Sequence, residues 1–318
     1  MRRETNGDRT RDSRNHNPVL YQLSYGLREA RRIPIVARGV NGTDGDRAVG
    51  YGIGVRFHAI QTAPSWHEVS ANRAAIDARF ARLAAEGLRP GDFVVLPEMC
   101  ETGWTSDAEA LRRVTGTVDW LASLASRHGV WVQAGFGEVV DDTRVANSVA
   151  VLAPSGERKA LYRKNFLFPS EQHAFVAGDE IVLVDLGEAV VCPLICYDLR
   201  FPELWRLAAL AGAEVFTVSS AWPEVRHAHW RALLVARAVE NQALVVACNR
   251  TGTDPTQRYA GGSTAITEVG ERAFEADESE CALSHEFSRA SLHAWRAKFG
   301  ALRDARASLL GSIRVRRV

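Results

Sequence analysis

One stretch, residues 190–212, constrains the fold of this 318-residue chain more than any other. It begins with a run of apolar residues that predicts a buried strand, passes through a polar corner at residues 196–198, and continues into a helix that opens at Pro202. Proline suits the first position of a helix because its φ is fixed and its missing N–H needs no partner there. A buried strand followed at once by a helix is typical of layered α/β folds.

Cys196 is the first candidate nucleophile, because the corner places its thiol at the end of the strand. The backbone N–H groups of the corner and the start of the helix favour negative charge and therefore the reactive thiolate. A cysteine in an apolar run is more often a small buried hydrophobe, and Cys192 in the same strand has that ordinary interpretation. The position at the strand end separates Cys196 from Cys192.

Strands and helices alternate over most of the chain. After Pro64, apolar residues at helical spacing (Ile76, Phe80 and Leu83) predict a helix that ends at Gly87. The other predicted helices are 117–128, 226–241 and 287–298. The predicted strands are 54–60, 93–96, 130–136, 146–152, 159–164, 190–195, 214–218, 243–248 and 263–266. The pattern predicts one α/β domain with layered sheets, and no internal repeat is evident.

Composition bounds the domain organisation and excludes several classes of partner. Residues 1–50 are polar and rich in arginine, so we expect an N-terminal extension without a fixed fold, followed by a domain at 51–300 and a C-terminal tail at 301–318. A net charge of +1 gives no field for nucleic acid or a membrane surface, and no apolar run is long enough to span a bilayer. Five cysteines without regular spacing indicate a reducing cytoplasm, and no cysteine or histidine pair has zinc-site spacing.

Glu98 and Lys164 share one property with Cys196: each follows an apolar strand. Only three of the 39 basic residues are lysines, which suggests that an ammonium is required where lysine persists. Alone, Glu98 reads as a surface carboxylate and Lys164 as a strand-end residue that reaches solvent. Because strand ends of layered α/β folds converge on one crevice, the three side chains together predict a site.

A thiol, a carboxylate and an ammonium together suit attack on a carbon bonded to nitrogen. Glu98 accepts the thiol proton, and Lys164 with the backbone N–H of Tyr197 stabilises the oxyanion that forms when Cys196 adds to an amide carbon. Glu98 then protonates the departing ammonia and activates water against the thioester. This chemistry requires no metal and no organic cofactor, and its partner is a small-molecule amide.

Three motifs resemble the nitrilase superfamily of carbon–nitrogen hydrolases: Pro97-Glu98, Tyr162-Arg163-Lys164 and the stretch from Cys196 to Glu203. The resemblance covers residues from about 54 to the C-terminal helix and implies a four-layer α-β-β-α sandwich, a Glu98, Lys164 and Cys196 triad, and a homodimer. The chain looks most like the bacterial omega-amidase branch, which hydrolyses the terminal amide of 2-oxoglutaramate or 2-oxosuccinamate. Further matching stretches are 168–173, 221–223, 236–242, 248–252 and 259–263.

The resemblance also implies roles for residues that the composition alone leaves open. Glu171 matches a second family glutamate that positions the substrate or tunes Lys164. Tyr197, Arg200, Trp222 and His173 become candidates for the substrate-binding wall. Arg200 suits a substrate carboxylate bidentately, and a structural role at the corner is an equal alternative.

Two positions depart from the family pattern, and three alternatives to an omega-amidase stay open. Phe166 stands where the family often has a histidine, and Cys100 replaces an apolar or aromatic residue. The alternatives are a hydrolase of N-carbamoyl compounds or nitriles, a hydrolase of a protein- or cofactor-derived amide, and a noncatalytic scaffold that keeps the fold.

Overall fold

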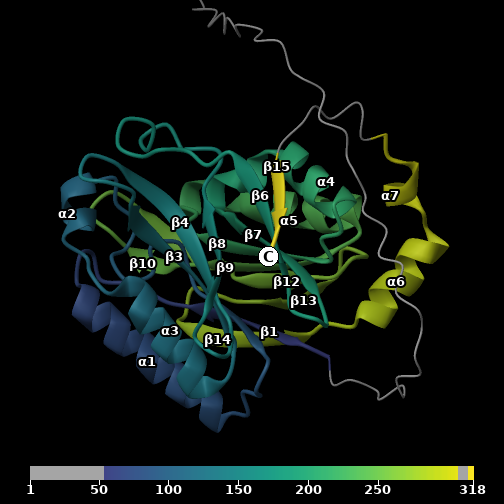
Figure 1. Ribbon diagram of the computed structural model, residues 1–318, viewed down its shortest axis with the longest axis horizontal. Coiled ribbons are helices and arrows are strands. Elements are labelled where there is room, and N and C mark those ends of the chain that lie inside the picture. Colours follow the sequence, from purple (N-terminus) through teal and green to yellow (C-terminus); the bar gives the residue numbers. More distant parts are fainter. Residues whose placement is uncertain (1–53, 307–313) are drawn as a thin grey trace, which may run out of the picture. The chain divides into compact units, whose positions relative to one another are not determined.

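The computed structural model describes residues 54–306 and 314–318 (Figure 1). The predicted extension at residues 1–50 lies outside the described residues. Two β-sheets dominate the described part, a six-stranded sheet and a seven-stranded sheet, and a short two-stranded pair lies apart from them. None of the helices in these segments is long and apolar enough to cross a membrane.

The six-stranded sheet has the order β14-β1-β2-β3-β4-β5. Its central strands β1, β2 and β3 are parallel, and β14, β4 and β5 add antiparallel at the two sides. The strands are β1 (Arg56–Gln61), β2 (Phe93–Val95), β3 (Trp131–Val139), β4 (Val145–Leu152), β5 (Arg158–Arg163) and β14 (Cys281–Glu286). Strands β1 and β2 are buried along nearly their whole length, and β3 is buried over the five residues after Trp131, so polar side chains such as Gln61 and Gln133 are buried with the apolar ones.

The seven-stranded sheet has the order β13-β12-β9-β8-β7-β6-β15. Strands β7, β8 and β9 are parallel at its centre, and β6 and β12 flank them antiparallel. The strands are β6 (Glu180–Asp185), β7 (Val190–Ile195), β8 (Val215–Ser220), β9 (Leu244–Asn249), β12 (Thr264–Ile266), β13 (Arg272–Glu275) and β15 (Arg314–Arg317). The separate pair is β10 (Thr251–Thr253) with β11 (Arg258–Ala260).

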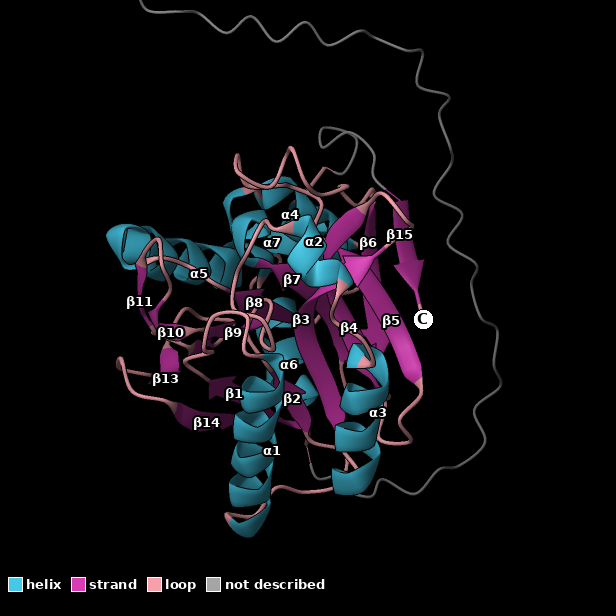
Figure 2. Ribbon diagram, turned by 90° about the vertical axis from the view of Figure 1, so that its left-hand side faces the viewer, coloured by secondary structure: helices cyan, strands magenta, loops and turns pink. Residues whose placement is uncertain are grey.

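The helices cover the outer faces of the two sheets, so the molecule has four layers. Helices α1 (Val69–Ala85) and α3 (Thr117–His128) lie on the side of the six-stranded sheet, and α4 (Pro202–Leu210) and α5 (His227–Asn241) lie on the side of the seven-stranded sheet (Figures 1 and 2). The shorter helices are α2 (Ala108–Arg112), α6 (Arg289–Lys298) and α7 (Ala301–Asp304), with single turns η1 (Cys196–Arg200) and η2 (Glu224–Arg226).

The inner faces of the two sheets meet in one apolar core. Phe57, Phe93 and Val149 of the six-stranded sheet belong to the same buried cluster as Leu194 and Val218 of the seven-stranded sheet. A second cluster, which includes Ile76, Phe80 and Leu83, packs the helices onto the outer face of the first sheet. These layers confirm the α-β-β-α sandwich expected from the sequence.

Two edge elements differ from the sequence prediction. Strand β6 falls in a segment to which no strand was assigned, although its residues are apolar and buried. Residues 314–317, which we expected in a C-terminal tail at 301–318, form β15 in parallel pairing with β6. The sequence of β15 has no apolar alternation, and the strand exists because the edge of β6 offers backbone groups that need partners.

Candidate active site

Glu98 lies three residues after the end of β2 and is completely buried. Its Oε2 accepts a hydrogen bond of 2.8 Å from the backbone N–H of Ala221, at the end of β8. The neighbouring β3 supplies a glycine at the point of closest approach: a Cβ on Gly135 would lie 2.6 Å from the Cα of Glu98. Met99, the next residue, has a φ of 47°, so the chain turns sharply behind the carboxylate. The backbone of both sheets therefore fixes the position of Glu98: Ala221 binds its carboxylate, and Gly135 packs against its Cα.

Lys164 lies between two buried carboxylates. Its Nζ is 2.9 Å from Oε1 of Glu98 and 2.9 Å from Oε1 of Glu171. The side-chain amide of Asn147, on β4, donates to the same two oxygens at 2.7 Å each. Oε2 of Glu171 accepts the backbone N–H of Phe168 at 2.7 Å, which closes the loop around the lysine. One ammonium and one neutral amide thus hold the two glutamates side by side.

Cys196 stands at the corner where β7 ends and η1 begins, with its backbone in the left-handed region at a φ of 39°. A non-glycine residue in that region costs on the order of 1–3 kcal/mol, which the surrounding contacts must offset. Asp198 supplies them: its carboxylate accepts hydrogen bonds from the backbone N–H of Ile195 and Phe166 and from the hydroxyl of Tyr162. The corner is thereby tied to the segment that carries Lys164.

The electrostatics of the site keep the thiol protonated and the lysine charged. Burial and then the charge of Glu98 raise the pKa of Cys196 well above its ordinary value, against the opposing effect of Lys164. Burial acts to lower the pKa of Lys164, but Glu98 and Glu171 outweigh it and raise that pKa above its usual range. A protonated thiol beside a carboxylate needs that carboxylate as a base before it can attack.

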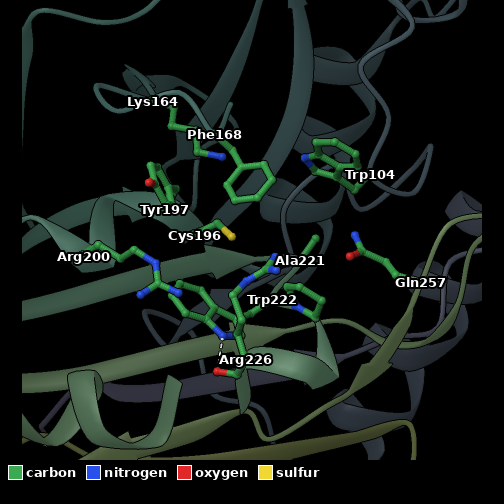
Figure 3. Close-up of a pocket in the computed structure, with 11 residues that line it drawn as sticks. Trp104, Lys164, Phe168, Cys196, Tyr197, Arg200, Ala221, Trp222, Arg226 and Gln257 are labelled. Atoms are coloured by element: carbon green, nitrogen blue, oxygen red, sulfur yellow. Dashed lines mark hydrogen bonds between the residues drawn. The ribbon is translucent and has the colours of Figure 1, made fainter. Parts of the chain in front are cut away.

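A pocket with about 390 Å³ of unfilled space, partly open to solvent, leads to Cys196 (Figure 3). Of the residues that the sequence identified, Lys164, Cys196, Tyr197, Arg200 and Trp222 line it. Glu98 and Glu171 contact Lys164 and are themselves completely buried.

His173 lies apart from this group. Its side chain is exposed in the segment after Glu171, and it is not among the residues that line the pocket. Because the chain turns back from Glu171 to Phe175 through hydrogen bonds to the carbonyl of Glu171, only Glu171 itself is directed inward. His173 therefore has no contact with the pocket that would support a role in substrate binding.

The remaining residues of the pocket wall were not identified from the sequence. They are Trp104, Phe168, Ala221, Pro223, Arg226 and Gln257. Asn147, the bridge between the two glutamates, was missed as well. Arg226 begins the predicted helix at 226–241 and Asn147 lies within the predicted strand at 146–152, but nothing local distinguishes these two residues from ordinary surface or core residues.

Phe166, at the position where a histidine was expected by resemblance, packs face to face on Phe201 with ring centroids 3.6 Å apart. Tyr197 meets Phe201 and Phe168 edge to face, so aromatic rings line the corner beside the thiol. Cys100, the other departure, is a buried thiol whose pKa is raised by burial. Neither change removes a partner of Glu98, Lys164 or Cys196.

Comparison with known proteins identifies the family. The model of the carbon–nitrogen hydrolase family matches residues 58–297, which include Glu98, Lys164 and Cys196 and every strand of the two sheets except β15 and the start of β1. The chain belongs to the carbon–nitrogen hydrolase family. The family match and the four-layer fold therefore agree.

Among the curated relatives of this carbon–nitrogen hydrolase are two bacterial amidases. The 2-oxoglutaramate amidase of Bacillus subtilis (strain 168) is 37% identical over 194 residues, which cover 59% of this chain and 75% of the relative. The omega-amidase YafV of Escherichia coli (strain K12) is 31% identical over 256 residues, which cover 79% of this chain and 97% of the relative.

Solved structures of the superfamily share the fold of this carbon–nitrogen hydrolase. XC1258 of Xanthomonas campestris, a superfamily protein with an arsenic adduct in its active site, superposes with a TM-score of 0.72 at 29% identity, covering 80% of this chain and 98% of that chain. A cysteine-to-alanine mutant of the Nesterenkonia AN1 amidase gives a TM-score of 0.71 at 25% identity, covering 81% and 96%.

Proposed function

We propose that this carbon–nitrogen hydrolase is a cysteine-dependent amidase of the omega-amidase type. It hydrolyses the terminal amide of a small carboxylated substrate, such as 2-oxoglutaramate or 2-oxosuccinamate, and releases ammonia through a thioester intermediate. The observation that carries the proposal is that Lys164 and Cys196 line one pocket, while the buried carboxylate of Glu98 bonds Lys164 and lies close enough for its charge to act on the thiol. Glu171 bonds the same lysine. The names of the relatives support the same substrate class.

The first half-reaction forms the thioester. Glu98 takes the proton of Cys196 as the sulfur adds to the amide carbon, because the raised pKa of the thiol leaves it protonated at rest. The negative charge that develops on the amide oxygen is stabilised by the ammonium of Lys164 and the backbone N–H of Tyr197, donors of a kind worth about 3–4 kcal/mol each. The carbon–nitrogen bond then breaks, and Glu98 returns the proton to the departing ammonia.

The second half-reaction releases the acid. Glu98 deprotonates a water molecule, the resulting hydroxide adds to the thioester carbon, and the thiol of Cys196 leaves with its proton restored. Glu171 acts as a positioning residue, because it binds Lys164, Asn147 and the backbone N–H of Phe168, whereas the charge of Glu98 acts directly on the thiol of Cys196. No metal ion and no organic cofactor takes part in these steps.

The substrate lies against a wall formed by Tyr197, Arg200 and Trp222.

The active protein is a homodimer in the cytoplasm. All five cysteines are free thiols, which supports a reducing compartment. The family resemblance supports the dimer, in which the helix after Cys196 packs on its partner. Light scattering of the purified chain distinguishes a dimer from a monomer.

The test of the proposed function is ammonia release from 2-oxoglutaramate. The wild-type chain should release ammonia, and Cys196→Ala should release none while keeping its fold by circular dichroism. Cys192→Ala, four residues earlier in the same buried strand, is the matched control and should stay active. Ammonia from the Cys196→Ala chain would refute the nucleophile, and carbon dioxide released from a ureido acid instead would indicate an N-carbamoyl hydrolase.

A further inference from the structure

At the thiol end of the pocket, the positive charge of Lys164 is already paired with carboxylates. The ammonium of Lys164 is bonded to both Glu98 and Glu171, and the other donor to these two carboxylates, Asn147, is neutral. A second carboxylate placed here would face two like charges at short range in a water-poor site, which is unfavourable. Any carboxylate on a substrate must therefore lie at the other side of the pocket.

Two arginines line that other side, Arg200 and Arg226. Arg200 already has neighbours that occupy it: its Nη2 lies 3.3 Å from Nδ1 of His229, and its guanidinium lies over the ring of Trp222, 4.7 Å from the centroid. Stacking on an aromatic face and a hydrogen bond to an imidazole together fix a guanidinium against the wall. This arrangement suits a wall residue more than a ligand for an incoming anion.

Arg226 is held differently. Its backbone carbonyl accepts a hydrogen bond of 2.8 Å from Nε1 of Trp222, and its guanidinium lies over the ring of Phe168, 5.2 Å from the centroid. Among the residues that the structure describes, no hydrogen bond or ion pair involves the guanidinium itself, so its N–H groups are free. Figure 3 shows the side chain extending toward Cys196 and Ala221, on the side of Cys196 away from Lys164. An oriented guanidinium without an anion is prepared for bidentate binding of a carboxylate.

We propose that Arg226, rather than Arg200, binds the carboxylate of the substrate. The inference rests on the proposed amidase function and refines it: the preferred substrate is a short linear molecule with an amide at Cys196 and a carboxylate at Arg226. Neutral amides of the same length are poorer substrates because they leave the guanidinium without a partner. Arg226 is thus the residue that determines charge specificity.

The test compares a charged and a neutral amide of matched length, succinamate and butyramide, by their kcat/KM for ammonia release. In the wild-type chain the ratio should favour succinamate. Arg226→Gln should lower this ratio by about 100-fold, the loss expected for a bidentate charge-assisted pair, and the loss should fall mainly on KM. Arg226→Lys should lower it by about tenfold, because an ammonium keeps the charge but not the fork. Arg200→Gln, the matched control, should lower the ratio by less than about threefold.

A binding measurement separates this proposal from the proposed function. Succinate, a dicarboxylate probe, is titrated calorimetrically into the Cys196→Ala chain with and without Arg226→Gln. Binding that weakens by about 100-fold in the double variant supports Arg226 even if the wild-type chain hydrolyses no amide. The proposal is overturned if succinate binds equally well to both chains or to neither, if Arg200→Gln causes the larger loss of charge preference, or if Arg226→Gln lowers both amides equally.

Discussion

Two buried acidic residues bracket the short strand β2, and they have opposite surroundings. Asp92 precedes the strand and is 2% exposed, whereas Glu98 follows it and is completely buried. The carboxylate of Asp92 is 2.9 Å from Nη2 of Arg56 and 3.0 Å from Nε2 of His58, and it accepts the backbone N–H of Arg89 at 2.8 Å. Around Asp92 basic partners outnumber the acid, whereas around Glu98 two acids share one ammonium.

The contrast explains why we expect a structural role for the acid at one end of β2 and the proposed reaction at the other. Burial opposes the charge of Asp92, but hydrogen bonds from Arg89, Arg56 and His58 outweigh it and hold the pKa of this carboxyl below its usual range. The carboxylate of Asp92 therefore stays ionised at neutral pH, and its oxygens are taken up by hydrogen bonds to these partners. Glu98 instead shares the ammonium of Lys164 with Glu171 and lies close to the protonated thiol of Cys196, where the proposed reaction needs a carboxylate that exchanges a proton.

The largest effect on activity is expected at the ammonium that distinguishes the Glu98 end. Lys164→Arg should lower kcat for ammonia release by at least about 10³-fold, because a planar guanidinium cannot bond both carboxylates and the oxyanion from one point. Lys159→Arg changes a half-buried lysine on strand β5, which ends directly before Lys164; this variant is the control and should keep its rate. A near-native rate for Lys164→Arg would remove the special role given to this ammonium.

The next largest effect on activity is expected at Asn147, the neutral side chain that bridges the two glutamates. Asn147→Ala should lower kcat by about 100-fold with little change in KM, because both glutamates lose the donor that fixes their positions, and small displacements at a reacting centre cost about this much. Asn165→Ala is a nearby control, since that side chain bonds Tyr162 and a backbone carbonyl and neither glutamate. Steady-state kinetics of the two variants should differ by more than an order of magnitude; equal rates would contradict the bridging role.

Substitutions of two glycines of β3 distinguish the effect of displacing Glu98 from the effect of destabilising the fold. Gly135→Ala puts a Cβ 2.6 Å from the Cα of Glu98, and Gly137→Ala puts one 2.6 Å from the side chain of Leu111. Both should lower the free energy of unfolding by about 1–3 kcal/mol through overpacking. Activity at a temperature where both are folded should fall by about tenfold or more in Gly135→Ala only. Equal activities would show that the carboxylate tolerates displacement.

The smallest effect on activity is expected at the other end of β2. Asp92→Asn should change kcat by less than about twofold, yet lower the free energy of unfolding at pH 7 by about 1–3 kcal/mol, because the partly buried guanidinium groups of Arg56 and Arg89 lose their counter-charge and hydrogen bonds to the buried carboxylate are weakened. The lowered pKa of Asp92 means that its stabilisation is present above the unfolded carboxyl pKa of about 4 and is lost as the pH falls through the folded pKa. Urea unfolding at pH 7 and pH 3 should therefore show a smaller difference between variant and wild type at the lower pH. A large loss of activity in folded Asp92→Asn would end the distinction between the two ends.

The sequence by itself determined the layered α/β class and predicted which three strand ends carry the candidate reactive residues. Apolar runs and helical spacing are local properties, so the helix at 117–128 has the predicted bounds and the strands before Glu98, Lys164 and Cys196 were found. The chemistry of a thiol, an ammonium and a carboxylate at strand ends is likewise visible without coordinates. Strand-end positions converge by a general rule of sheet packing, which is why their meeting could be predicted.

The tertiary structure alone decided which further residues join them. Asn147 becomes a bridge because β4 lies between the segments that carry Glu98 and Glu171, and Arg226 faces the pocket because η2 turns it toward Phe168. His173 is exposed although it stands two residues from Glu171, and β15 forms because β6 has a free edge. Each of these outcomes depends on contacts between residues far apart in the chain, and such contacts leave no periodic trace in the sequence that makes them.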